Sequence, residues 1–135
     1  MRWPHALATA LVGGALVACG DDGGPGQPGT LVVSLTTPNT GDAGILLTLT
    51  GPGFENVAAA ASNQRIYWRL RADNEARVLV LADLTSGPLL TVSVPDVRQA
   101  ASYAGVVQDV TDQENRLRVG LDAYGISVTR DDRTP

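Results

Sequence analysis

The sequence is short of the side chains that most enzymes use for catalysis. Its 135 residues contain one cysteine, Cys19, and one histidine, His5, and all ten basic residues are arginine. Without lysine there is no Ser-Lys dyad or Schiff base, and a lone histidine and cysteine cannot build an ordinary zinc or copper site. The glycine-rich phosphate loops of nucleotide-binding proteins are also missing. We therefore expect neither an enzyme nor a cofactor.

Positive charge is the second shortage. Fourteen acidic residues against ten arginines give a formal net charge of −4. Nucleic-acid-binding domains need clustered positive charge, so DNA and RNA are not expected partners. Hydrophobic residues make up 44% of the chain and charged residues 18%, which indicates one globular domain with a modest core.

The sequence also lacks an apolar run long enough to cross a bilayer, which takes about 20 residues. Residues 6–18 are apolar or small with one exception, and they follow the positive charge of Arg2. Gly13-Gly14 at the centre of this run disfavours a buried helix, because each glycine costs about 1 kcal/mol relative to alanine. A charged start, a short apolar run and small residues at its end are typical of an export signal. We predict that residues 1–18 are such a signal.

The end of this run, Leu16-Val17-Ala18-Cys19, resembles the lipobox of bacterial lipoproteins. In that family the cysteine receives a diacylglyceryl thioether, the signal is cut before it, and the new amino terminus is often acylated, for example with palmitate. The resemblance implies that Cys19 is the lipidated first residue of the mature protein. Two or three acyl chains anchor a protein stably, because each buried methylene contributes about 0.8 kcal/mol. A plain secretory cleavage would instead leave an odd free thiol in an oxidising compartment.

Cleavage before Cys19 would also remove His5. The mature chain would then contain neither histidine nor lysine, which excludes a Ser-His-Asp triad. In lipoproteins of Gram-negative bacteria an aspartate directly after the cysteine commonly signals retention in the inner membrane. Gly20 stands there, so the resemblance implies the outer membrane. The implied partner is the lipid bilayer, reached through acylated Cys19, and no nucleotide partner is expected.

The segment after the cysteine has the composition of a flexible linker. Residues 20–29, GDDGGPGQPG, hold five glycines, two prolines and no apolar anchor. Such a segment cannot offset its ordering entropy by burial. We predict that residues 19–29 tether a folded domain, residues 30–135, to the membrane.

From Thr30 onward, apolar and polar residues alternate with a period close to two, the pattern of strands with one buried face. Clusters rich in Gly, Pro, Asn and Asp separate these runs and indicate turns. Eight strands are predicted in this way, at residues 30–36, 45–50, 64–71, 76–82, 89–94, 104–110, 116–119 and 124–130. The runs at 56–63 and 96–103 are candidates for short helices, the second capped by Asp96.

Strands of this length and spacing predict an all-β domain, a two-sheet sandwich of about seven to nine strands. The segments Gly44–Pro52, Arg77–Leu84 and Ser86–Leu90 resemble immunoglobulin-like and cohesin-like sandwich modules of small lipoproteins. A cohesin-like module would imply a binding or scaffolding role. Residues 78–81 are apolar on both faces, which predicts that their strand is central or covered on its outer side.

The strand expected over residues 64–71 carries the main candidate binding residues. Alternation places Ile66, Trp68 and Leu70 inward, with Trp68 in the core. The outward side chains are Arg65, Tyr67, Arg69 and Arg71. Arginine and tyrosine are enriched at binding hot spots, so this stripe is a candidate partner-binding surface. The alternative is a solvated face whose arginines pair with acidic residues of neighbouring strands.

Three acidic residues near one predicted turn, Asp109, Asp112 and Glu114, form the one candidate metal site. Carboxylate oxygens there could join backbone carbonyls around a hard cation such as calcium. The sequence has no twelve-residue EF-hand loop, and the alternative is that these are solvated turn residues. No other metal site is expected.

Together these features predict a non-enzymatic cell-envelope lipoprotein whose sandwich is a binding or interaction module for an envelope protein or glycan. The alternative is a structural or assembly subunit of a larger envelope complex. An enzyme acting on envelope glycans would need a close carboxylate pair. The glutamates Glu55, Glu75 and Glu114 all fall in or beside predicted turns, where exposure explains them.

Overall fold

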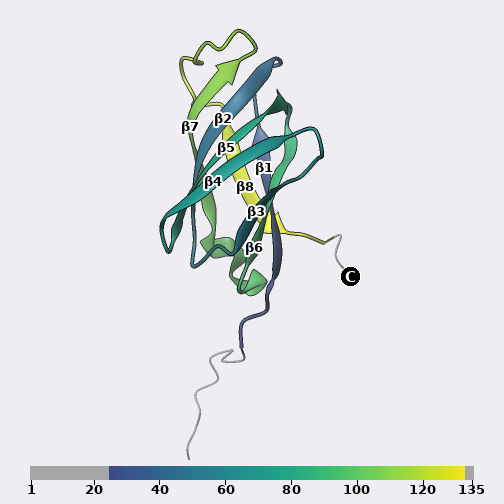
Figure 1. Ribbon diagram of the computed structural model, residues 1–135, viewed down its shortest axis with the longest axis vertical. Helices are drawn as coiled ribbons and strands as arrows, with labels where there is room; N and C mark the ends of the chain where they lie inside the picture. Colours follow the sequence, from purple (N-terminus) through teal and green to yellow (C-terminus); the bar gives the residue numbers. More distant parts are fainter. Residues whose placement is uncertain (1–24, 133–135) are drawn as a thin grey trace, which may run out of the picture.

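The computed structural model describes residues 25–132, which form a sandwich of two four-stranded sheets (Figure 1). One sheet has the order β3-β6-β1-β8 and the other β4-β5-β2-β7, and all paired strands are antiparallel. The strands are β1 (Gly29–Thr36), β2 (Asp42–Thr50), β3 (Asn56–Ala59), β4 (Arg65–Ala72), β5 (Glu75–Leu84), β6 (Gly87–Val94), β7 (Ala104–Asp112) and β8 (Gly125–Arg130). The predicted all-β, two-sheet sandwich is confirmed.

The core lies between the sheets and is built from the apolar member of each alternating pair. On β2 these are Ile45, Leu47 and Leu49, and on β5 they include Val78 and Val80, all almost without exposed surface. Because successive side chains of a strand point to opposite faces, each run that alternates in sequence buries one face here. β5 lies between β4 and β2, as its apolar residues on both faces predicted.

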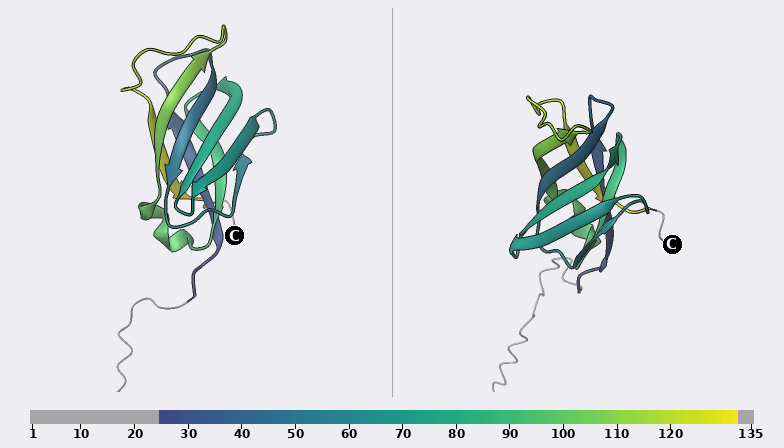
Figure 2. Two further views of the ribbon diagram at one scale, coloured as in Figure 1. Left: turned by 60° about the vertical axis from the view of Figure 1, so that its left-hand side comes forward. Right: turned by 45° about the horizontal axis from the view of Figure 1, so that its top comes forward.

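The two ends of the sandwich are closed differently. At one end lie the β1–β2 loop and the long segment 113–124 between β7 and β8, and at the other lies η1 (Val97–Ser102), a 3-10 helix before β7 (Figure 1). Asp96 caps η1 by accepting a hydrogen bond from the Arg98 backbone N–H, as predicted. Figure 2 shows β7, β2, β5 and β4 side by side, with the chain entering at the η1 end.

The predicted helix at residues 56–63 is wrong. Residues Asn56–Ala59 form strand β3, which pairs with β6 and places Val57 opposite Val92. The alanines favour a helix, but burying Val57 against the core outweighs that weak preference. Pairing with a neighbouring strand therefore decides the structure of this segment.

The predicted strand at residues 116–119 is also wrong. The segment is a loop that touches β7 through an isolated bridge between Thr111 and Leu117. Its apolar side chains Leu117 and Val119 are exposed, because Arg118 between them turns inward to a buried carboxylate. Backbone hydrogen bonds to β7 and the Arg118–Asp42 ion pair, and not a buried apolar face, attach residues 116–119 to the domain.

The end of the predicted tether is attached to the domain. The Gln27 N–H donates to Asp96 Oδ1 over 3.2 Å, and the Val97 N–H donates to the Gln27 carbonyl oxygen over 2.8 Å. The Arg98 guanidinium donates to the Pro25 carbonyl oxygen, and its hydrogen bonds to Asp96 are the main reason that the pKa of Asp96 falls to about 2. The domain therefore includes residues 25–29 and not only 30 onward, because η1 supplies their hydrogen-bond partners. Residues 19–24 of the predicted tether lie outside the described part of the chain.

Candidate functional site

The predicted arginine and tyrosine stripe lies on the outer face of the sheet β4-β5-β2-β7, at its edge. Arg65, Tyr67, Arg69 and Arg71 are all exposed on β4, with 56% of Tyr67 accessible to solvent. Ile66 and Trp68 alternate with them and pack against the core, as expected. Period-two geometry therefore presents four large polar side chains from a single strand.

Leu70 departs from the predicted alternation. It was expected inward with Ile66 and Trp68, but it is 46% exposed. It lies near the end of the edge strand, opposite Ala76 and next to the β4–β5 turn at Asp73 and Asn74. Because β4 has a sheet neighbour on one side only, its last residues run out beyond the covered core.

The arginines of this face have few acidic partners. Arg71 is 3.7 Å from Glu75 across the β4–β5 hairpin. Within residues 25–132, no carboxylate lies within 4.0 Å of Arg65, Arg69 or Arg77. Arg69 instead lies directly opposite Arg77 of β5. Like charges placed opposite each other on one sheet face repel. Among the arginines of this face, only Arg71 has an acidic partner within 4.0 Å in the described chain.

A shallow hollow of about 240 Å³ lies on the same face. Its lining includes Leu46, Tyr67, Arg69, Arg77 and Leu79. The lining combines apolar and aromatic side chains with two arginines, Arg69 and Arg77. This combination suits a ligand with apolar groups and a negative charge.

Two polar atoms of this face are buried without a hydrogen-bond partner. They are the hydroxyl oxygen of Thr48 and Nε of Arg77, which belong to paired residues of β2 and β5. A buried donor or acceptor that lacks a partner costs free energy. An added polar group that reached them would recover part of that cost.

The predicted calcium ligands are not assembled. No group of three or more His, Cys, Asp or Glu side chains in residues 25–132 is placed to hold a metal ion. Oδ1 of Asp112 accepts hydrogen bonds from the backbone N–H groups of Glu114 and Arg116, each over 2.9 Å. These hydrogen bonds lower the pKa of Asp112, and the one from Arg116 has the largest effect. Asp112 therefore closes a turn, and Asp109 lies on β7 opposite Leu46.

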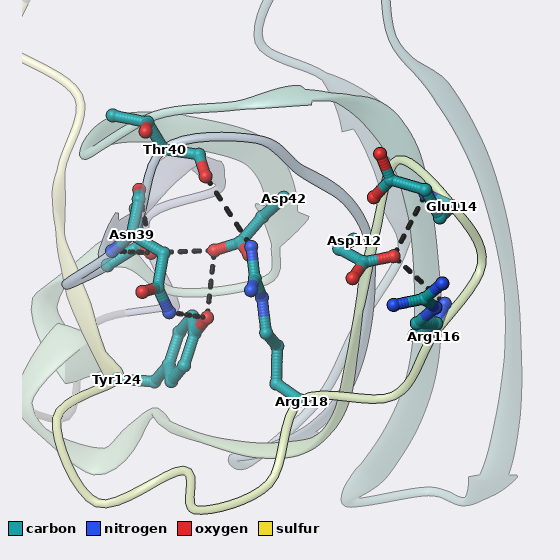
Figure 3. Close-up of polar contacts among 9 residues, drawn as sticks. Asn39, Thr40, Asp42, Asp112, Glu114, Arg116, Arg118 and Tyr124 are labelled. Carbon is teal, nitrogen blue, oxygen red and sulfur yellow. Dashed lines mark hydrogen bonds and ion pairs between the residues drawn. The ribbon is translucent and has the colours of Figure 1, made fainter.

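The one charged residue that is buried in the described chain was not predicted by alternation. Asp42 is fully buried, and its carboxylate accepts hydrogen bonds from three side chains (Figure 3). Arg118 Nε donates to Oδ1 over 2.8 Å, and the hydroxyls of Thr37 and Tyr124 donate to Oδ2 over 2.7 and 2.9 Å. Asn39 Nδ2 in turn donates to the Tyr124 hydroxyl. We call these five residues the Asp42 network.

The position of Asp42 follows from an irregularity in β2. Strict alternation from Ile45 and Leu47 would place Asp42 on the outer face. The register with both neighbouring strands shifts between Asp42 and Gly44, and Gly41 takes a positive φ of 84° just before. The carboxylate therefore turns toward the end of the core. In the sequence, Asp42 is a charged residue directly after a turn, and nothing in that pattern indicates that it is buried.

The electrostatics of Asp42 fit a structural role. Burial by itself raises the pKa of this carboxyl, but hydrogen bonds from Thr37, Arg118 and Tyr124 and the charge of Arg118 outweigh it. The net result is a pKa below its ordinary value of 3.8. Because both oxygens are occupied by donors of the same chain, the Asp42 network joins the β1–β2 loop to segment 113–124.

The predicted lipidation residue, Cys19, lies outside the described residues. Within residues 25–132 no helix is long and apolar enough to cross a membrane. Comparison of the chain with known protein families, with curated proteins and with solved structures finds no match. The fold and the site geometry define the class of protein, a two-sheet β-sandwich with a cationic face.

Proposed function

We propose that this chain is a lipid-anchored lipoprotein of the bacterial cell envelope, held in the outer membrane, whose β-sandwich is a non-enzymatic binding module. The observation that carries the binding role is the exposed face of β4. There Tyr67 and Arg69 line the hollow, and in the described chain Arg65 and Arg69 have no acidic partner within 4.0 Å. On an acidic protein of net charge −4, such a face is complementary to an anionic partner.

The anchoring role rests on Leu16-Val17-Ala18-Cys19 at the end of the apolar run. The absence of an enzymatic role rests on residue types, since the chain after Cys19 contains no histidine or lysine. A binding module needs neither. The described end of the predicted tether, residues 25–29, attaches to the η1 end of the domain through hydrogen bonds with Asp96, Val97 and Arg98.

Photo-cross-linking in the native host tests the binding role. A photoreactive amino acid at Tyr67 is expected to form covalent adducts with envelope components on irradiation. The matched control is the same amino acid at Thr129, which is exposed on β8 in the other sheet. Equal adducts from both positions, or none from Tyr67, would contradict the proposal. A single stoichiometric protein adduct from both faces would instead identify an assembly subunit.

Replacing Cys19 tests the anchor separately. We expect Cys19→Ser to move the protein from the membrane fraction to the soluble fraction of the cell envelope, because the variant cannot carry a thioether-linked lipid and loses the free energy of every buried methylene. Gly20→Ser is the control, since it changes the adjacent residue and leaves the cysteine. Membrane fractionation followed by immunoblotting measures the result. If Cys19→Ser stays in the membrane, the chain is not anchored through this residue.

A further inference from the structure

We infer that β4 is a receptor strand for an extended, acidic segment of a partner protein, which adds to the sheet as a fifth strand next to β4. This inference rests on the proposed binding function and names the partner class for the same face. It follows from three features of β4: a free backbone edge, the spacing of its arginines, and the charge of the residues around them.

The free edge comes first. In the described chain, β4 pairs with β5 and residues 65–72 have no backbone hydrogen bond to any other segment. The opposite edge strand of the same sheet, β7, is partly covered, because Arg118 N–H donates to the Val110 carbonyl and Asp112 N–H donates to the Arg116 carbonyl. A free edge presents a row of N–H and C=O groups that only another peptide backbone matches.

The edges of the other sheet are less suitable. Strand β3 has four residues, half the length of β4. Strand β8 has six residues and lies beside β7 across the side of the sandwich. The eight residues of β4, which lie beside β3 without a backbone hydrogen bond to it, therefore form the longest edge strand in the described chain with no backbone hydrogen bond on its outer side.

The side chains of β4 determine which strand can add there. Arg65 and Arg69 project to one face four residues apart, with Tyr67 between them, at about 7 Å for each two residues. In an added antiparallel strand, side chains directly opposite lie on the same face and contact these three. Acidic residues four positions apart in the incoming strand would face both arginines, and the residue midway between them would contact the Tyr67 ring.

The surrounding charges favour an acidic occupant over a second copy of this chain. Two β4 strands paired with each other would set arginines against arginines, which repel. Arg69 already faces Arg77 across the β4–β5 pair, so an anionic group beside Arg69 would relieve a repulsion present in the free protein. The same charges that oppose self-association therefore select an acidic partner.

Hydrogen exchange with a synthetic strand tests the inference. The probe is a decapeptide with glutamate at every second position and valine or threonine between, added to the full chain in a neutral detergent. We expect slower exchange of β4 amides and a dissociation constant below about 1 mM that rises with salt. The Arg65→Ser/Arg69→Ser variant is expected to bind about tenfold more weakly or worse. Arg130→Ser, an exposed arginine of β8, is expected to bind like the wild type.

Three results would overturn strand addition. One is equal binding of a peptide with the same sequence in which every backbone nitrogen is methylated, since that peptide has no N–H group to donate to the ladder. Another is no binding, or protection away from β4. The third is arginine-dependent binding to phosphatidylglycerol vesicles with unchanged β4 exchange, which would assign the face to a lipid surface. If any of these three results is obtained but Tyr67 still forms a specific adduct in the host, the proposed binding function stands and only strand addition is rejected.

Discussion

The Asp42→Ala variant is expected to lose about 3 kcal/mol of unfolding free energy, a large effect for the loss of one charged side chain. Removal of the carboxylate leaves the guanidinium of Arg118 and the hydroxyls of Thr37 and Tyr124 without their acceptor. The expected loss is at the low end for a broken buried ion pair, because the Arg118 side chain is 28% exposed and can be partly hydrated. Urea unfolding followed by circular dichroism measures it.

Asp109→Ala is the matched control for this prediction. Asp109 is an exposed aspartate on β7 that takes no part in the Asp42 network, and its removal is expected to change stability by less than about 0.5 kcal/mol. A loss below about 1 kcal/mol for Asp42→Ala would show that the network is not held together by its charge.

The same network predicts a pH dependence of stability. The pKa of Asp42 in the folded chain is lowered below 3.8, whereas in the unfolded chain it takes its ordinary value. Its contribution is therefore fully present above the unfolded pKa and is lost as the pH falls through the folded pKa. We expect the stability difference between wild type and Asp42→Asn to shrink between about pH 5 and about pH 2. A difference that stays constant over this range would contradict the lowered pKa.

The Tyr103→Ala variant is expected to lose about 3 to 4 kcal/mol, because it opens a cavity at the η1 end of the core. Tyr103 is buried, its ring meets Phe54 edge to face with centroids 5.4 Å apart, and its hydroxyl donates to the Gly53 carbonyl oxygen over 2.6 Å. Urea unfolding again provides the measurement. A loss of less than about 1.5 kcal/mol would mean that the surrounding chain collapses into the space.

Two further variants separate the contributions of Tyr103. Tyr103→Phe keeps the ring and removes the hydrogen bond, so we expect it to cost about 1 kcal/mol. Gly51→Val tests the close packing of the ring from the other side, because a Cβ atom at Gly51 would overlap the ring of Tyr103. Tyr103→Phe is expected to lose less stability than Tyr103→Ala if the cavity, and not the hydrogen bond, dominates. Gly51→Val is expected to destabilise the domain because the Tyr103 ring must move.

The candidate binding face shows how far sequence reasoning reaches at this site. The period of two over residues 64–71 predicted that Arg65, Tyr67, Arg69 and Arg71 share one face, because the alternation of side chains is a local property of an extended backbone. The residues across the sheet could not be predicted in this way. That Arg69 faces Arg77, and that Glu75 reaches Arg71, depends on the strand pairing and its register.

The Asp42 network shows the opposite case. Asp42 and Arg118 are 76 residues apart, and no spacing or motif connects them. The alternating segment 116–119 suggested a strand with buried apolar residues, whereas the structure turns the Arg118 head group toward the buried Asp42 and exposes Leu117 and Val119. Similarly, the alanines after Asn56 indicated a helix, but pairing with β6 made a strand. In each case a long-range contact outweighed a weak local preference.

The sequence by itself determined that this domain is all-β, where most of its strands lie, which side chains of β4 face solvent, and which catalytic residue types are absent. The anchoring of Cys19 stays a prediction from its lipobox. Only the tertiary structure decided the strand order, the free edge of β4, the attachment of residues 25–29 to η1, and the burial of Asp42. The physical reason is that alternation and residue type act within a few neighbours, whereas sheet partners and buried charge pairs depend on which distant segments exclude water together.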